Sequence, residues 1–172
     1  RVRANDALRR HPVSLGIVGA DGSTHLIEAS RSIGEQFEIW HSVDPVEGAL
    51  SSLSITHAHL GHVDGLGLFG KEAMGANHLT LHCSESFAAL IENSPPWHDL
   101  CEQEVIIPKV WTSNEAFEPS SGCGFRIKPI QVPHRDELSD NHALLIEGSG
   151  ANLLFLPDHD SWPETLRGRN IR

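Results

Sequence analysis

Three histidines at spacing i, i+2 and i+5 directly follow a short strand. Residues 52–56 are predicted to be a buried strand, and the chain then runs into His57, His59 and His62. At a strand end, residues i and i+2 point to the same side, and Gly61 permits a turn that brings the third histidine round. A helix would not align this spacing on one face. Two imidazoles on one side of a strand end form half of a tetrahedral zinc site, so the pattern predicts a metal site here.

The alternative is a chance cluster, because the chain has 12 histidines in 172 residues. Chance is a good explanation for any single histidine. It is a poor explanation for His57, His59 and His62 together, because they lie where an apolar strand stops and a glycine turn starts. His142 begins a predicted strand and is expected to pack. Six further histidines have no partner at metal spacing and are expected to be ordinary surface or core residues: His11, His25, His41, His78, His82 and His98.

Strands and helices are predicted along the rest of the chain. The predicted strands are residues 13–19, 25–28, 52–56, 79–83, 105–107, 110–112, 125–132, 143–147 and 152–156. The predicted helices are residues 30–40, 63–74, 84–93 and 161–169, with a helical turn at 97–101 and a helix or arm at 1–10. Asp21–Gly22 indicates a hairpin, Ser84 a helix N-cap and Pro95–Pro96 a helix end. This order predicts a layered, mixed α/β (α+β) fold, with residues 1–172 forming a single domain.

Charge and composition limit the kinds of partner that we expect. The net charge of −10 comes from acidic residues spread along the chain, with no basic run, so nucleic acid is not expected as a stable partner. No apolar run of about 18 residues is present, so we expect no membrane span. No secretory leader is visible, and we expect a cytoplasmic protein. The three cysteines are odd in number and lack CxxC spacing, which favours free thiols over a disulfide framework.

The histidine motif resembles the HxHxDH signature of the metallo-β-lactamase superfamily. Three strand ends carry the resemblance: Thr56–His62 with Gly65–Leu66 behind it, Pro133–His134, and Phe155–Asp158. More narrowly, residues 55–62, 93–97, 132–139 and 155–162 resemble the branch of pyrroloquinoline quinone (PQQ) biosynthesis protein B-like metallo-hydrolases. The resemblance covers residues 9–162 and implies an αββα sandwich. The superfamily domain is normally longer, so truncation at one or both ends is expected.

The resemblance also implies a set of metal ligands. The first metal site would be made by three histidines: His57, His59 and His134. His62 and Asp158 would belong to a second site, with Asp158 able to bridge both. Gly61 stands where the family has an aspartate, and the family's final downstream histidine is not found. We therefore expect one firmly bound zinc ion and a weak or empty second position, with iron or manganese left open.

Polar residues around these ligands have competing interpretations. Arg135 is a candidate to hold an anionic substrate group and Asp136 to orient a ligand imidazole, while an ordinary polar loop is an equal alternative. Asp64 is a possible replacement for the missing aspartate, but a first-turn acid favoured by the helix dipole is the better interpretation. Asp160 and His159 are either partners of a metal ligand or merely solvated, and solvation is the favoured interpretation.

These residues predict a metal-dependent hydrolase. Its substrate would be a small ester, lactone or phosphodiester, attacked by a metal-bound hydroxide while Asp158 acts as a catalytic group on the water. The resemblance raises a second hypothesis, an oxygenase-type redox step in quinone cofactor biosynthesis. A third is a non-catalytic metal-binding protein that keeps the fold, which the loss of a ligand at Gly61 favours. A homodimer is a further possibility.

Overall fold

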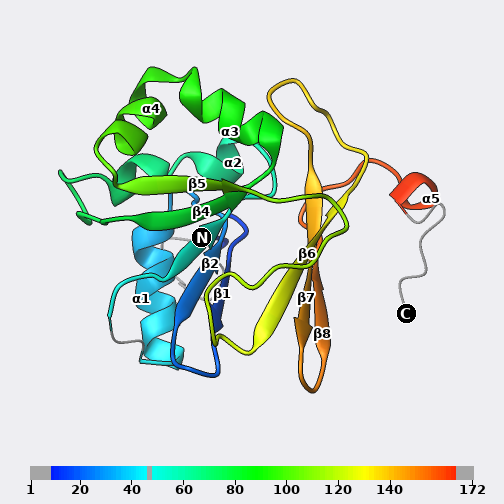
Figure 1. The fold of residues 1–172 in the computed structure, drawn as a ribbon, viewed down its shortest axis with the longest axis horizontal. Helices are drawn as coiled ribbons and strands as arrows, with labels where there is room; N and C mark the ends of the chain where they lie inside the picture. Colours follow the sequence, from blue (N-terminus) through cyan, green and yellow to red (C-terminus); the bar gives the residue numbers. More distant parts are fainter. Residues whose placement is uncertain (1–8, 46–47, 166–172) are drawn as a thin grey trace.

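The computed structural model describes residues 9–45 and 48–165, which form two sheets packed against each other (Figure 1). The first sheet has the order β1 (Leu15–Val18), β2 (Thr24–Ile27), β3 (Ser52–Ser54), β4 (Leu79–Cys83) and β5 (Ile106–Val110). The second has the order β6 (Phe125–Gln131), β7 (His142–Gly148) and β8 (Asn152–Phe155). The predicted layered α/β class is confirmed.

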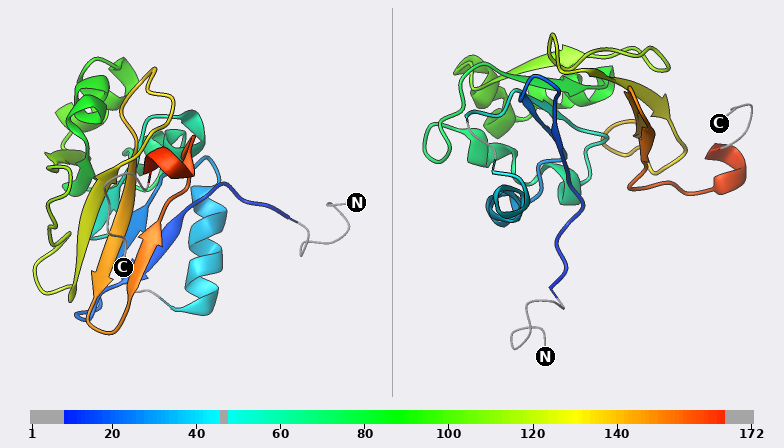
Figure 2. Two further views of the ribbon diagram at one scale, coloured as in Figure 1. Left: turned by 90° about the vertical axis from the view of Figure 1, so that its right-hand side faces the viewer. Right: turned by 90° about the horizontal axis from the view of Figure 1, so that it is seen from below.

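Helices cover the outer face of the first sheet. They are α1 (Ile33–Val43), α2 (Leu60–Val63), the 3₁₀ helix η3 (Leu66–Phe69), α3 (Glu85–Glu92) and α4 (Pro95–Glu102). The larger apolar core lies between these helices and the sheet and includes Ile33, Leu53 and Phe87. The short helix α5 (Trp162–Thr165) lies on the side of the second sheet (Figures 1 and 2).

A second apolar cluster joins the two sheets. Ile27 of β2 packs with Phe125 and Ile127 of β6 and with Leu144 of β7. On the other face of β6 and β7, a third cluster gathers Ile130, Val132 and Ala143. Alternate residues of β6 therefore enter different clusters, as the two-residue period of a strand requires.

The topology brings several strand ends together at one place. Strands β2, β3 and β4 are parallel, so their carboxyl ends share one edge of the first sheet. Strands β6 and β8 both run antiparallel to β7, so their carboxyl ends lie at the same end of the second sheet. The backbone N–H of His142, at the start of β7, donates to the carbonyl of Thr56 at 3.2 Å. The loops after β2, β3, β6 and β8 therefore meet at this edge.

Two local predictions are confirmed. The hairpin at Asp21–Gly22 joins β1 to β2, and Gly22 has the positive φ of 82° that such a turn favours. Ser84 is the N-cap of α3, where its hydroxyl accepts a hydrogen bond from the backbone N–H of Phe87. Both features depend on a few neighbouring residues, which is why the sequence alone indicates them.

The helix predicted at 63–74 is wrong in extent. The chain instead forms α2, then η3 after a break at Gly65. The N–H of Gly65 donates to the carbonyl of Ala29 at 2.7 Å. A Cβ at this position would lie 2.1 Å from the carbonyl oxygen of Ser30. This close backbone contact stops the α-helix at a place that periodicity does not reveal.

Two predictions for segments that contain prolines differ from the structure. Residues 105–107 and 110–112 are not two strands but the single strand β5, which tolerates Pro108 because it lies at the edge of the sheet. Pro95 and Pro96 do not merely end a helix; they open α4, at positions where a missing N–H costs no hydrogen bond. Helix α1 runs from Ile33 to Val43, later than predicted, and its N-cap Ser32 makes no side-chain capping bond.

Some expectations fall outside the described residues. The predicted arm at 1–10 lies largely in residues 1–8, outside the described ranges. The predicted helix at 161–169 begins as α5 (Trp162–Thr165), and its residues 166–169 lie outside those ranges. Within those ranges, no helix is long and apolar enough to cross a membrane. The three cysteines are free, as expected, with Cys83 and Cys123 buried.

Candidate metal centre

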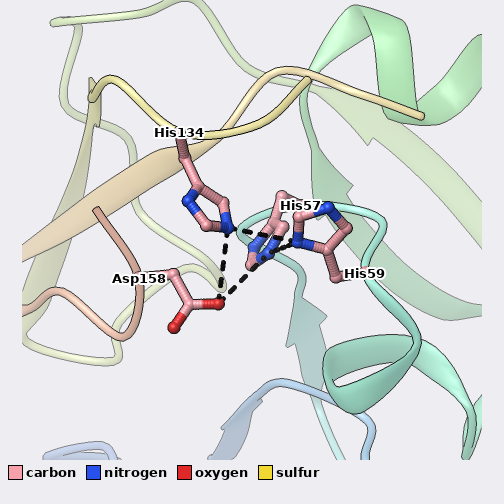
Figure 3. Close-up of side chains that lie close together, drawn as sticks. All are labelled: His57, His59, His134 and Asp158. Atoms are coloured by element: carbon pink, nitrogen blue, oxygen red, sulfur yellow. Dashed lines mark hydrogen bonds and ion pairs between the residues drawn. The ribbon is translucent and has the colours of Figure 1, made fainter. Parts of the chain in front are cut away.

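Four side chains from three loops converge at the shared edge of the two sheets (Figure 3). His57 and His59 follow β3, His134 follows β6, and Asp158 follows β8. One ligand atom from each lies within 4.8 Å of all the others. Within residues 9–45 and 48–165, this is the one group of histidine, cysteine and acidic side chains with such spacing. The chain thus brings together the predicted first-site histidines and Asp158, across about 100 positions.

The spacing of the ligand atoms suits a small ion. His59 Nδ1 lies 2.9 Å from His57 Nε2 and 3.2 Å from His134 Nε2. Asp158 Oδ2 lies 3.5 Å from His57 Nε2 and 3.7 Å from His134 Nε2. Ligands of a tetrahedral zinc ion with bonds of about 2.0–2.1 Å are about 3.3 Å apart. These four of the six distances fall on both sides of that value, and the other two stay within 4.8 Å, so the residues can close around a zinc ion.

The outer nitrogen of each imidazole faces an oxygen acceptor. His59 Nε2 lies 3.2 Å from Glu137 Oε2, and His134 Nδ1 lies 2.8 Å from Asp160 Oδ1. When those nitrogens carry the proton, the inner nitrogens present lone pairs. Lone pairs that face each other and a carboxylate repel, and a cation between them removes the repulsion.

A buried carboxylate holds the outer side of His57. The hydroxyl of Thr56 donates to Glu28 Oε1 at 2.5 Å and lies 3.0 Å from His57 Nδ1. Because that hydroxyl proton is used on Glu28, the oxygen accepts the N–H of His57. Glu28 is fully buried, at a positive φ of 71°, and burial raises the pKa of its carboxyl although His62 and Thr56 oppose the rise.

His57 is held as a neutral imidazole. Burial lowers its pKa to about 3, and the nearby imidazoles of His62, His59 and His134 add to the effect. Neutral imidazole is the form that binds a metal. At neutral pH, His57 is therefore already in the form that coordinates a metal ion.

His62 lies beside the cluster, at the predicted second position. Its Nε2 is 3.2 Å from Asp158 Oδ2, and its Nδ1 is 3.4 Å from Glu28 Oε1. Burial alone would lower the pKa of His62, but Glu28 and Asp158 outweigh it and raise the pKa. An added Cβ at Gly61 would meet nothing within 4 Å, so the missing aspartate leaves open space. Asp158 thus lies where it can bridge, while the second position lacks one oxygen donor.

The other predicted residues have distinct surroundings. Arg135 is exposed and pairs with Glu137 at 3.3 Å. Asp136 makes no hydrogen bond or ion pair to the cluster in the described part of the chain. Asp64 pairs with Arg31 at 3.0 Å and does not join the cluster, which agrees with its interpretation as a non-ligand. The expectation that Asp160 is merely solvated is wrong, because it contacts His134.

Sequence reasoning missed Glu28 and Glu137. Glu28 ends a buried strand next to β3, and an acid at that position was a signal, because parallel strands end at the same edge. Glu137 lies in a polar loop with several acids, and no pattern there distinguishes it from its neighbours. Its contact with His59 depends on how the loop after β6 folds back.

Other buried histidines have a different role. His25 is held between the hydroxyls of Ser23 and Ser52, each at 2.8 Å. His82 Nε2 lies 3.2 Å from the carbonyl of Pro119. Both therefore contact hydroxyls or a carbonyl, outside the metal cluster. Burial lowers the pKa of each, to about 4 for His82.

The fold and this cluster define a family. The sequence model of the beta-lactamase superfamily domain matches residues 24–170, and the chain belongs to that family. No curated protein matches. The resemblance inferred from the three strand-end motifs is thus confirmed, and the αββα assignment with it.

Solved structures agree on the fold. Zn²⁺-bound PqqB from Methylobacterium extorquens superimposes with a TM-score of 0.71 at 20% identity, covering 89% of this chain and 55% of that one. A diphosphatase of the PhnP family gives 0.57 at 18% identity, covering 80% and 49%. The short form of human tRNase Z gives 0.57 at 12% identity, covering 92% and 70%. The chain thus spans about half the length of the first two.

Proposed function

We propose that this chain is a metal-dependent hydrolase acting on a small ester, lactone or phosphodiester. The observation that carries the proposal is the convergence of three inner imidazole nitrogens and Asp158 Oδ2 on one point. His57, His59 and His134 would hold one zinc ion and leave a position on it open to water. His62 and Asp158 would form a second position, which we expect to be weak or empty.

The ion and the residues have separate roles. A zinc ion held by three imidazoles lowers the pKa of a coordinated water towards about 7 and polarises a carbonyl or phosphoryl oxygen. Asp158 is half-exposed, and one of its oxygens faces the cluster. Its carboxylate would orient the attacking water and take its proton. His62, hydrogen-bonded to the same oxygen, would hold that carboxylate in place.

Substrate class follows from charge. The net charge of −10 disfavours a polyanion as a stable partner. Arg135, whose side chain is 65% exposed, is a cationic residue beside the cluster. It would bind a single carboxylate or phosphate group of a small substrate.

The test has two steps. Protein purified without added metal would be assayed for zinc, iron and manganese, and then with a panel of esters, lactones and phosphodiesters. We expect about one zinc ion per chain and hydrolysis of at least one class. His57→Ala should remove both, while His98→Ala, at an exposed site on α4, should change neither. Metal content unchanged by His57→Ala would contradict the proposal.

A redox step remains a second candidate, favoured by the likeness to PqqB, which has the highest TM-score of the three structures compared. Histidines and one carboxylate with open positions also suit iron in non-haem oxygenases. The metal found in the first step separates the two candidates. Iron as the retained metal, with no activity on the panel, would favour the redox step. Stoichiometric zinc and no turnover would favour a non-catalytic metal-binding protein.

A further inference from the structure

We propose that Asp160 is a positioning residue that fixes the tautomer of His134, so that its Nε2 rather than its Nδ1 faces the metal. This inference rests on the proposed metal site and assigns Asp160 a role that the ligand set does not include. The inner nitrogen of His134 is Nε2, which lies 3.2 Å from His59 Nδ1. For Nε2 to coordinate, the proton must reside on Nδ1.

Asp160 makes two contacts with the loop after β6, one to His134 and one to Pro133. Asp160 Oδ1 lies 2.8 Å from His134 Nδ1, and the backbone N–H of Asp160 donates to the carbonyl of Pro133 at 2.8 Å. The backbone contact fixes the position of the loop after β8 against the loop after β6. The carboxylate is thereby held at hydrogen-bonding distance from the imidazole. The Asp160 side chain is 51% exposed, so it keeps part of its hydration while it makes the contact with His134.

The tautomer matters because the imidazole does not favour it alone. In water, neutral histidine carries its proton mostly on Nε2. Which nitrogen is protonated in a protein depends on the hydrogen bond that the other one makes. The carboxylate of Asp160 accepts only from Nδ1–H, so it reverses the intrinsic preference of His134. Such a carboxylate partner also orients the imidazole ring towards the metal.

His59 provides an internal comparison. Its outer nitrogen is Nε2, which lies 3.2 Å from Glu137 Oε2. Here the carboxylate stabilises the tautomer that imidazole already prefers. Glu137 is also shared with Arg135, at 3.3 Å. Loss of Glu137 should therefore leave the tautomer of His59 unchanged, whereas loss of Asp160 should change that of His134.

The first measurement needs no metal. Long-range ¹H–¹⁵N correlation spectra of the metal-free protein at pH 8 report the tautomer of each imidazole. We expect His134 as the Nδ1–H form in the unaltered chain and mainly as the Nε2–H form in Asp160→Ala. His59 should remain Nε2–H in both the unaltered chain and Glu137→Ala.

The second measurement is zinc affinity by competition with a chelator. Asp160→Ala should weaken binding by about 10–100-fold, the usual effect of losing a carboxylate partner of a ligand histidine. Asp160→Asn keeps an acceptor and should lose less. Asp136→Ala removes a nearby exposed charge without that contact and should change affinity by less than about fivefold. Thermal melting of the metal-free variants checks that each one folds.

The outcomes separate this inference from the proposed function. His134 as Nε2–H in the unaltered protein, or equal zinc affinity in Asp160→Ala and Asp136→Ala, would overturn the role of Asp160 even if zinc binds. If the unaltered protein binds no zinc, but His134 is Nδ1–H and loses that form in Asp160→Ala, the positioning role stands and the metal-dependent function fails.

Discussion

His57 and His25 are equally buried and have opposite environments. Each is 1% exposed. Both nitrogens of His25 meet hydroxyls, those of Ser23 and Ser52. Only the outer nitrogen of His57 meets a hydroxyl, and the inner one faces the nitrogen of His59 at 2.9 Å.

The difference shows what identifies a ligand histidine. Burial does not, because both side chains are buried, and neither does a lowered pKa, because burial lowers the pKa of both. The distinguishing feature is one satisfied nitrogen and one that faces another acceptor. His82, with a carbonyl at Nε2, belongs with His25 as a structural residue. Replacing a histidine of the metal cluster by alanine should therefore affect metal binding, whereas replacing His25 or His82, the buried pair, should affect stability.

The largest contrast is expected for His134→Ala. Loss of one of three imidazoles should weaken zinc binding by more than about 100-fold, beyond the effect of losing an outer partner. The metal-free variant should melt within a few degrees of the unaltered protein, because His57, His59 and Asp158 still occupy the site beside the lost imidazole. Chelator competition and calorimetry measure both. If this variant bound zinc as tightly as the unaltered protein, the distinction between ligand histidines and the buried pair would be wrong.

The converse contrast is His82→Ala. It removes a side chain that is 2% exposed and leaves the Pro119 carbonyl without its partner. We expect a loss of about 3 kcal/mol in the free energy of unfolding, from the cavity and the lost hydrogen bond together. Zinc affinity of the folded variant should be unchanged. Urea denaturation tests the stability, with the exposed His98→Ala as a control that changes it by less than about 0.5 kcal/mol.

The buried pair should also make stability depend on pH. His82 in the unfolded chain takes up a proton near pH 6.5, whereas in the folded protein it resists until about pH 4. Its contribution is therefore complete above pH 7 and is lost as the pH falls from 6.5 to 4. At pH 4.5 this loss should reach roughly 2 kcal/mol for the metal-free protein. Denaturation at several pH values, with His82→Gln showing a flatter profile, checks the sign and size.

The smallest effect on folding is expected for Gly61→Asp. The side chain enters open space, so stability should change by less than about 0.5 kcal/mol. The added carboxylate should nevertheless raise the metal content from about one ion per chain towards two. Elemental analysis measures this, with Gly34→Asp, also in open space on a helix, as the control. Unchanged metal content would mean that the second position lacks more than this one oxygen.

The sequence predicted what depends on local patterns. The strand before His57, the cap at Ser84 and the turn at Gly22 each follow from a few adjacent residues. The resemblance supplied His134 and Asp158, which no local pattern could join to the first motif. The break at Gly65 was missed because it arises from backbone contact with a distant strand end.

The outer partners were the hardest part of the site to predict. Asp160 and Glu137 belong to loops rich in acids, and only the fold selects which acid reaches which imidazole. Asp136 also carries a carboxyl group and lies much closer in sequence to His134 than Asp160 does, yet it makes no such contact within the described chain. Residue type and sequence distance therefore do not separate a partner from a solvated neighbour.

Glu28 links both halves of the centre. One of its oxygens accepts from Thr56, which holds His57, and the same oxygen lies beside His62. Because a single oxygen serves both contacts, a shift of the Glu28 carboxylate would change the surroundings of His57 and of His62 together.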